Sequence, residues 1–139
     1  MPAMLLVVGL LSATQPAVTQ AASLKVTSFY TTSMIRYTTW VATHKDLPGP
    51  VKAFAADTKD VGLIVRYSGA TPKVSNLQIV IYTSSGNVYS SGHIHKLTHT
   101  TGTFADYFYY NPHFAGGAYK MKLLVNGKAD GSTSFSVTS

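Results

Sequence analysis

The sequence contains neither cysteine nor glutamate, and only 12% of its 139 residues are charged. Without cysteine, disulfide bonds, thiol catalysis, lipid attachment through a cysteine and Cys-ligated zinc are all excluded. Without glutamate, amphipathic helices lined by Glu–Lys pairs are hard to build. The fold must therefore depend on its apolar core, and the abundant β-branched and aromatic residues favour β-sheet.

Arginine is also scarce, because Arg36 and Arg66 are the only two in a chain of net charge +6. The lysines are spread from Lys25 to Lys128 without a run. Nucleic-acid binding requires clustered basic residues, with arginine as the favoured reader of bases, so no nucleic-acid partner is expected. The charge predicts either a solvated basic surface or weak adsorption to anionic wall polymers or acidic polysaccharide.

The first 22 residues differ from the rest of the chain. An apolar run at 4–11 is too short to span a membrane, which takes about 20 residues, and small residues follow it up to Ala21 and Ala22. This pattern predicts a secretory signal peptide at 1–22, a domain at 23–139, and a secreted, extracellular or cell-surface protein with no stable membrane span in its mature form. No Lys or Arg precedes the run, so a retained apolar arm is the alternative.

Alternating apolar and polar residues predict strands at 61–67, 77–82, 103–110 and 119–125. Residues 24–43 alternate more loosely and predict two strands or one bent strand. Two shorter segments are also expected to be extended: 51–58 as a short strand or a single helical turn, and 93–98 as an edge strand. No stretch after residue 22 shows a helical period.

The last stretch predicts a hairpin at the edge of a sheet. Asn126-Gly127 suits a tight turn, Asp130-Gly131 is a second turn signal, and a returning strand carries Phe135 and Val137 on one face. Recurrent short strands separated by turns predict an all-β, antiparallel β-sandwich, with an up-and-down barrel as the competing architecture.

Three short motifs carry a family resemblance: Gly117-Ala118-Tyr119, Val125-Asn126-Gly127 and 134–137, reading Ser-Phe-Ser-Val. Over residues 50–137 the chain resembles bacterial secreted immunoglobulin-like (fibronectin-III-like) domains. The resemblance implies a single antiparallel immunoglobulin-like β-sandwich of about seven to nine strands. It implies no activity, because such domains serve adhesion, carbohydrate binding, spacing and assembly alike.

Histidines form one candidate site. His93 and His95 are two apart, so on a strand their imidazoles share a face, and His99 joins them if the strand stays regular. Such a set could bind zinc or copper with a further ligand from a neighbour. The alternative is a row of solvated histidines on an edge strand.

Aromatic residues near the end of the 103–110 segment form the candidate ligand-binding site. Tyr107, Tyr109, Tyr110 and His113 could stack on sugar rings or anchor a protein contact. The alternative is that exposed tyrosines follow from β-propensity alone. Asp106 shares a strand face with aromatic neighbours and has no obvious carboxylate partner for glycosidase chemistry.

The sequence therefore predicts a non-catalytic binding or adhesion module without a cofactor. Its expected partner is an extracellular glycan, a cell-wall polymer or a protein, contacted through exposed Tyr and Lys. One alternative is the subunit of an extracellular filament that self-associates by β-strand addition. A second is a His-based metal protein or hydrolase.

Overall fold

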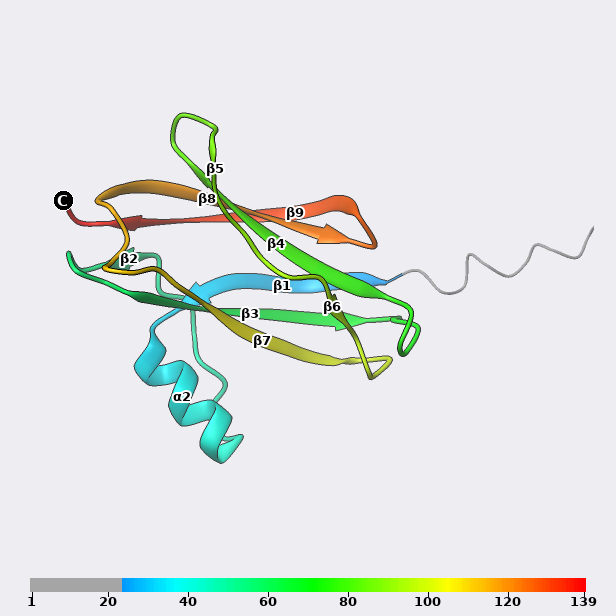
Figure 1. Cartoon of the computed structure of the whole chain (residues 1–139). Helices are drawn as coiled ribbons and strands as arrows, with labels where there is room; N and C mark the ends of the chain where they lie inside the picture. Colours follow the sequence, from blue (N-terminus) through cyan, green and yellow to red (C-terminus); the bar gives the residue numbers. More distant parts are fainter. Residues whose placement is uncertain (1–23) are drawn as a thin grey trace, which may run out of the picture.

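Two β-sheets stack face to face in residues 24–139, the part of the chain that the computed structural model describes (Figure 1). The first sheet has the order β1 (Lys25–Thr32), β3 (Asp60–Ser68), β7 (Gly102–Tyr109). The second has the order β2 (Ala53–Phe54), β9 (Lys128–Val137), β8 (Gly117–Val125), β4 (Asn76–Thr83), β5 (Val88–Ser91), and β6 (His95–Lys96) also pairs with β4. This arrangement confirms the predicted β-sandwich. The expected signal peptide at 1–22 lies outside the described residues.

The core lies between the two sheets and follows the period-two pattern of the sequence. Val61, Leu63 and Val65 of β3 are fully buried, and the alternating apolar residues of β4 and β8 face them from the other sheet. Because a strand sends successive side chains to opposite faces, the residues between them point outward. The strands predicted at 61–67, 77–82 and 119–125 are confirmed.

Residues Met34–Thr43 form a helix, α2, where the sequence predicted strand. Ser33 caps it, because the Ser33 Oγ accepts a hydrogen bond from the backbone N–H of Arg36 at 3.4 Å. Threonine hydroxyls within the helix donate to carbonyl oxygens one turn earlier, which accommodates residues that usually favour strands. The prediction of extended chain holds for β1 and is wrong for the helix. No helix in residues 24–139 has the length and apolar character needed to cross a bilayer.

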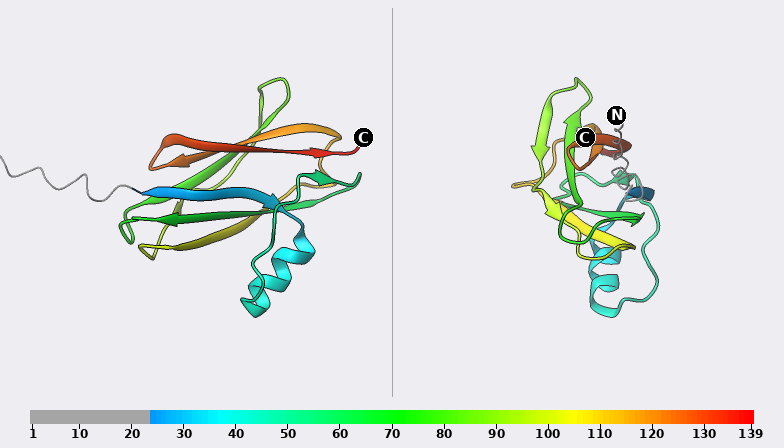
Figure 2. Two further views of the ribbon diagram at one scale, coloured as in Figure 1. Left: turned by 180° about the vertical axis from the view of Figure 1, so that it is seen from behind. Right: turned by 90° about the vertical axis from the view of Figure 1, so that its right-hand side faces the viewer.

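Helix α2 lies against one end of the outer face of the three-stranded sheet and extends away from it (Figure 2). Gly62 of β3 permits this approach, since a Cβ there would lie 3.1 Å from the Tyr37 Cβ and 3.2 Å from the Thr32 Cγ2. Ile64 points to the same face as Gly62 and is fully buried although it lies outside the main core. The outer face of this sheet is thus partly occupied by the protein itself.

The C-terminal hairpin is central in its sheet instead of forming the predicted edge, because β8 lies between β9 and β4 and the short β2 pairs in parallel with β9. Asn126-Gly127 makes the turn, with φ of 51° and 84°. The second predicted turn is wrong, because Asp130 and Gly131 lie within β9, where Gly131 adopts a φ of 116°. The hairpin turns only once.

Candidate binding site

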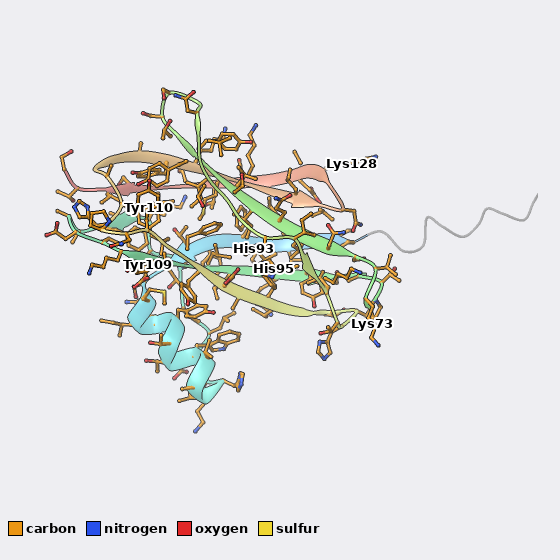
Figure 3. The ribbon with its side chains drawn as sticks, viewed as in Figure 1. Lys73, His93, His95, Tyr109, Tyr110 and Lys128 are labelled. Atoms are coloured by element: carbon orange, nitrogen blue, oxygen red, sulfur yellow. The ribbon has the colours of Figure 1, made fainter. Side chains whose placement is uncertain are left out.

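The predicted histidine cluster is not assembled as a metal site. His95 Nε2 lies 3.1 Å from Asp106 Oδ2, and the His95 ring packs on Phe104 at 4.9 Å between ring centroids. The His93 ring is 6.4 Å from the His95 ring (Figure 3). Asp106 points between the sheets, so its contact with His95 connects β7 to β6 across the open side of the sandwich.

His99 does not join these two histidines. Only His95 and Lys96 of the predicted 93–98 strand pair with β4. A strand of two residues is too short to hold His93, His95 and His99 on one face. The His99 Nδ1 lies 3.0 Å from the Thr98 hydroxyl instead. Within residues 24–139 no three His, Cys, Asp or Glu side chains come together as a metal-binding group.

The predicted aromatic site is divided between two sides of β7. Tyr107 and Tyr109 are 48% and 57% exposed on the outer face, where the ring of Tyr37 from α2 meets Tyr107 edge-on. Tyr110 packs on Tyr89 instead, at 4.6 Å between ring centroids, on the other side of the chain (Figure 3). These three tyrosines therefore do not form one flat platform.

His113, the fourth residue of the predicted set, lies in the loop that follows β7. Its Nδ1 is 2.9 Å from the carbonyl oxygen of Phe114, and its Nε2 is 3.8 Å from Asp57. Both contacts fix the ring within the loop. His113 is therefore separate from the exposed Tyr107 and Tyr109.

A different surface, on the outer face of the six-stranded sheet, forms an open groove of about 720 Å³. Its charged lining consists of three lysines, Lys52, Lys120 and Lys122. Its polar lining includes Tyr82, Thr83, Ser84, Ser132, Thr133 and Ser134. Tyr82, Ser132 and Ser134 share the outer face with the lysines that they pair with, whereas Thr83 and Thr133 pair with the inward-pointing Tyr119 and Met121. We call this surface the lysine groove.

Strand alternation and register place these side chains together. Tyr119, Met121 and Leu123 of β8 are buried in the core, so Lys120 and Lys122 between them must point outward. On one side of β8, Lys120 pairs with Tyr82 of β4 and Lys122 with Val80. On the other side, the same lysines pair with serines of β9. The Lys122 ammonium lies 5.1 Å from the centre of the Tyr82 ring, within the range of a cation–π contact.

No carboxylate lines the groove in residues 24–139. The ion pairs found in this part of the chain are the two His–Asp contacts, so the groove lysines are not neutralised by neighbouring acids. Uncompensated positive charges gathered in a depression attract anions. The groove can therefore bind an anionic, hydroxyl-rich molecule.

Beneath the groove, Tyr119 provides a neutral and rigid support. Burial raises the pKa of Tyr119 well above its usual range, and the hydrogen bond with Tyr89 and the nearby Tyr89 and Tyr110 raise it further. The Tyr119 hydroxyl donates to the carbonyl oxygen of Ala115. This tyrosine is thus a structural residue rather than an acid or base facing a ligand.

Sequence reasoning placed Lys120 and Lys122 on the polar face of a strand but did not connect them to a site. The missing information was the pairing of β4, β8 and β9, which brings Tyr82 and Ser134 beside Lys120 from positions far away in the sequence. The available signal was the pair of lysines two residues apart, on the face opposite the buried residues.

Comparison with solved structures identifies the fold. The chain superposes on an immunoglobulin-like protein from Pseudomonas aeruginosa with a TM-score of 0.59 and 13% sequence identity, over 84% of this chain and 98% of that one. The chain has an immunoglobulin-like fold. This immunoglobulin-like sandwich also matches part of an alkylpurine DNA glycosylase from Pseudomonas fluorescens, which was solved with DNA containing an abasic site analog. That match has a TM-score of 0.50 and 12% sequence identity, and it covers 85% of this chain and 31% of that chain.

No protein-family model matches the sequence, and no curated protein matches it either. At identities this low the structural matches establish the immunoglobulin-like fold alone. Function must be argued from the surfaces of the sandwich.

Proposed function

We propose that this immunoglobulin-like domain is a non-catalytic binding module that works outside the cell and holds a glycan or cell-wall polymer in the lysine groove. The single observation that supports this most directly is the groove itself. Three lysines line one open depression with Tyr82, Ser132 and Ser134 beside them on the same face, and no carboxylate lines it in residues 24–139. An open groove on a sheet face suits an extended ligand better than an enclosed small molecule.

The extracellular location is supported by sequence features. The apolar run and the small residues before Ser23 have the order of a secretory signal. The absence of cysteine makes the fold insensitive to the redox state of its surroundings. A surface rich in Ser, Thr and Tyr suits contact with polysaccharide hydroxyls.

Assembly into a filament by strand addition is the less favoured proposal, because the sheet edges carry features that discourage pairing. On β7, Asp106 points inward and its Oδ1 accepts the backbone N–H of Tyr107 at 2.8 Å. On β1, Thr31 exchanges hydrogen bonds with Val51, which covers the end of that edge. The edge strand β5 has only four residues. Inward charges, covered edges and short edge strands all oppose edge-to-edge association.

A hydrolase or metal protein based on the histidines is also less favoured. The His95–Asp106 pair has the spacing of an oriented imidazole, but no Ser, Thr or Cys is bonded to the free side of that ring in residues 24–139. Nucleophilic catalysis needs such a third group within hydrogen-bond reach. The pair instead connects the two sheets.

The test is retention of the purified domain on a panel of insoluble polysaccharides and bacterial cell walls. We expect at least one polymer to retain the wild-type protein. Ser134→Trp should abolish retention, because Ser134 lies in the groove and a bulky side chain there blocks it.

The matched control is Thr100→Trp, which places the same side chain on an exposed loop residue outside the groove lining. This variant should be retained like the wild type. Failure of every polymer to retain the wild-type domain would sink the proposal, and equal retention of Ser134→Trp would remove the groove as its site.

A further inference from the structure

We infer that the ligand of the lysine groove is a linear polysaccharide with carboxylate groups on successive sugars, bound with its axis along β8. This inference rests on the proposed function and specifies the chemistry of the partner. It is argued from the repetition of one arrangement of side chains along the groove.

The groove contains two rows of side chains that cross the sheet and share a lysine–serine pair, although the place of Tyr82 on β4 is taken by the apolar Val80 in the second row. In one row, Tyr82, Lys120 and Ser134 lie opposite one another on β4, β8 and β9. In the next row, Lys122 and Ser132 take the same places on β8 and β9. Each row presents one ammonium beside one hydroxyl. Two residues along a strand are about 6.6 Å apart, so the groove offers the same pair of groups twice at a short, regular spacing.

A repeated site matches a repeated ligand. A chain that carries one anion on each unit can place consecutive anions on Lys120 and Lys122, while its hydroxyls reach Ser132 and Ser134. The long lysine side chains adjust the spacing to the repeat of the ligand. A ligand with a single anion would use only one of the two rows.

The far side of the groove carries a third positive charge. Lys52 precedes β2, and its carbonyl oxygen accepts the backbone N–H of Ser136 at 2.8 Å, which fixes this residue beside β9. Lys52 therefore faces Lys120 and Lys122 across the serines of β9. The ligand would thus lie between Lys52 on one side and Lys120 and Lys122 on the other.

The lining favours a carboxylated sugar over a phosphate polymer. No arginine lines the groove, although the planar fork of arginine is the side chain that matches phosphate by two parallel hydrogen bonds. The hydroxyls of Tyr82, Ser132 and Ser134 lie beside the lysines instead, and sugars are rich in the hydroxyl groups that these can bind. Polyphosphate offers charge but no hydroxyls, and so uses only part of this surface.

The experiment measures binding of the full domain to polygalacturonate, to its fully methyl-esterified form and to inorganic polyphosphate. Polygalacturonate should bind most tightly, and the neutral ester should bind at least about tenfold more weakly because it keeps the sugars and loses the charges. Lys120→Gln/Lys122→Gln should weaken polygalacturonate binding about tenfold at about 0.01 M salt, where charges act over about 30 Å, and much less at about 1 M salt.

The matched control is Lys73→Gln/Lys128→Gln, which removes the same charge outside the groove lining, from the turn before β4 and from the first residue of β9 (Figure 3). This variant should bind like the wild type if the groove lysines act as a site and not through net charge alone. Equal loss in both double variants would overturn the inference.

Three further outcomes would also overturn it. Tighter binding of polyphosphate than of polygalacturonate would replace the sugar with a phosphate polymer. Equal binding of the ester and the acid would remove the requirement for charge, and no binding of polygalacturonate would remove the carboxylated polysaccharide as the ligand. In either case the proposed function is tested separately by the polymer panel.

Discussion

At the scale of single residues, Tyr119 connects the core to the functional surface. Its ring stacks on Phe135 at 4.9 Å, and it is only 4% exposed. Burial first, and then its neighbours Tyr89 and Tyr110, raise the pKa of Tyr119, so the folded protein keeps this phenol neutral at a pH where the unfolded chain ionises it. Its backbone also lines the lysine groove, between the outward-pointing lysine at 120 and Ala118.

The first prediction concerns stability at alkaline pH. Because the folded-state pKa of Tyr119 is raised, its contribution to stability is complete below about pH 10 and is lost as pH rises above that value. The free energy of unfolding should fall by up to about 1.4 kcal/mol per pH unit on account of this residue. Urea denaturation at pH values from 8 to 11 measures this decrease in the free energy of unfolding, because the range includes the ordinary tyrosine pKa of about 10.

The comparison variant is Tyr119→Phe, which keeps the ring and removes the ionisable hydroxyl. It should be less stable at neutral pH, because the hydrogen bond to Ala115 is lost. Its stability should fall less steeply above pH 10 than that of the wild type. Parallel pH curves for the two proteins would show that Tyr119 ionises normally in the folded state.

At the scale of elements, the helix α2 depends on a glycine in another strand. The second prediction is that Gly62→Ala lowers the free energy of unfolding by about 1–3 kcal/mol, as overpacked sites do. The added Cβ would crowd Tyr37 at 3.1 Å and Thr32 at 3.2 Å. Gly49→Ala is the control, because a Cβ at Gly49 meets nothing within 4 Å. Equal stability of the two variants would mean that the helix is not held closely against β3.

The contact between β6 and β7 provides a third prediction. His95 and Asp106 are each about one-third exposed, so solvent weakens their attraction. A double-mutant cycle of His95→Ala and Asp106→Ala should give a coupling energy of about 0.2–1 kcal/mol in thermal or urea unfolding. A coupling of zero would show that the ion pair adds nothing to the packing of the His95 ring on Phe104.

The sequence predicted the strands whose pattern of apolar and polar residues can be read within a single segment. Alternating burial along β8 follows directly from residues such as Met121, whose neighbours Lys120 and Lys122 are exposed, whereas in β3 the residues from Val61 to Val65 are all buried and only the strand itself was predicted. Helix α2 was missed because its threonines favour strands in general, and their hydrogen bonds to the preceding turn are visible only in the folded chain. The lysine groove was missed for a different reason: it depends on which strands pair, and pairing is not encoded in any one segment.

At the scale of the whole molecule, the two outer faces of the sandwich differ. Helix α2 occupies part of one face, and Tyr107 and Tyr109 are exposed beside it. The other face is open and carries the groove with Lys120 and Lys122. Three of the eleven basic residues of the chain, Lys52, Lys120 and Lys122, thus lie on a single concave surface. This asymmetry separates the two candidate binding surfaces and makes them distinguishable by experiment.

The most direct test of the account is a titration of the isotope-labelled domain with a short oligogalacturonate, followed by amide chemical shifts in NMR spectra. The account predicts that the shifts change along β4, β8 and β9, around Tyr82, Lys120 and Ser134. Changes centred on Tyr107 and Tyr109, with the groove residues unaffected, would contradict it.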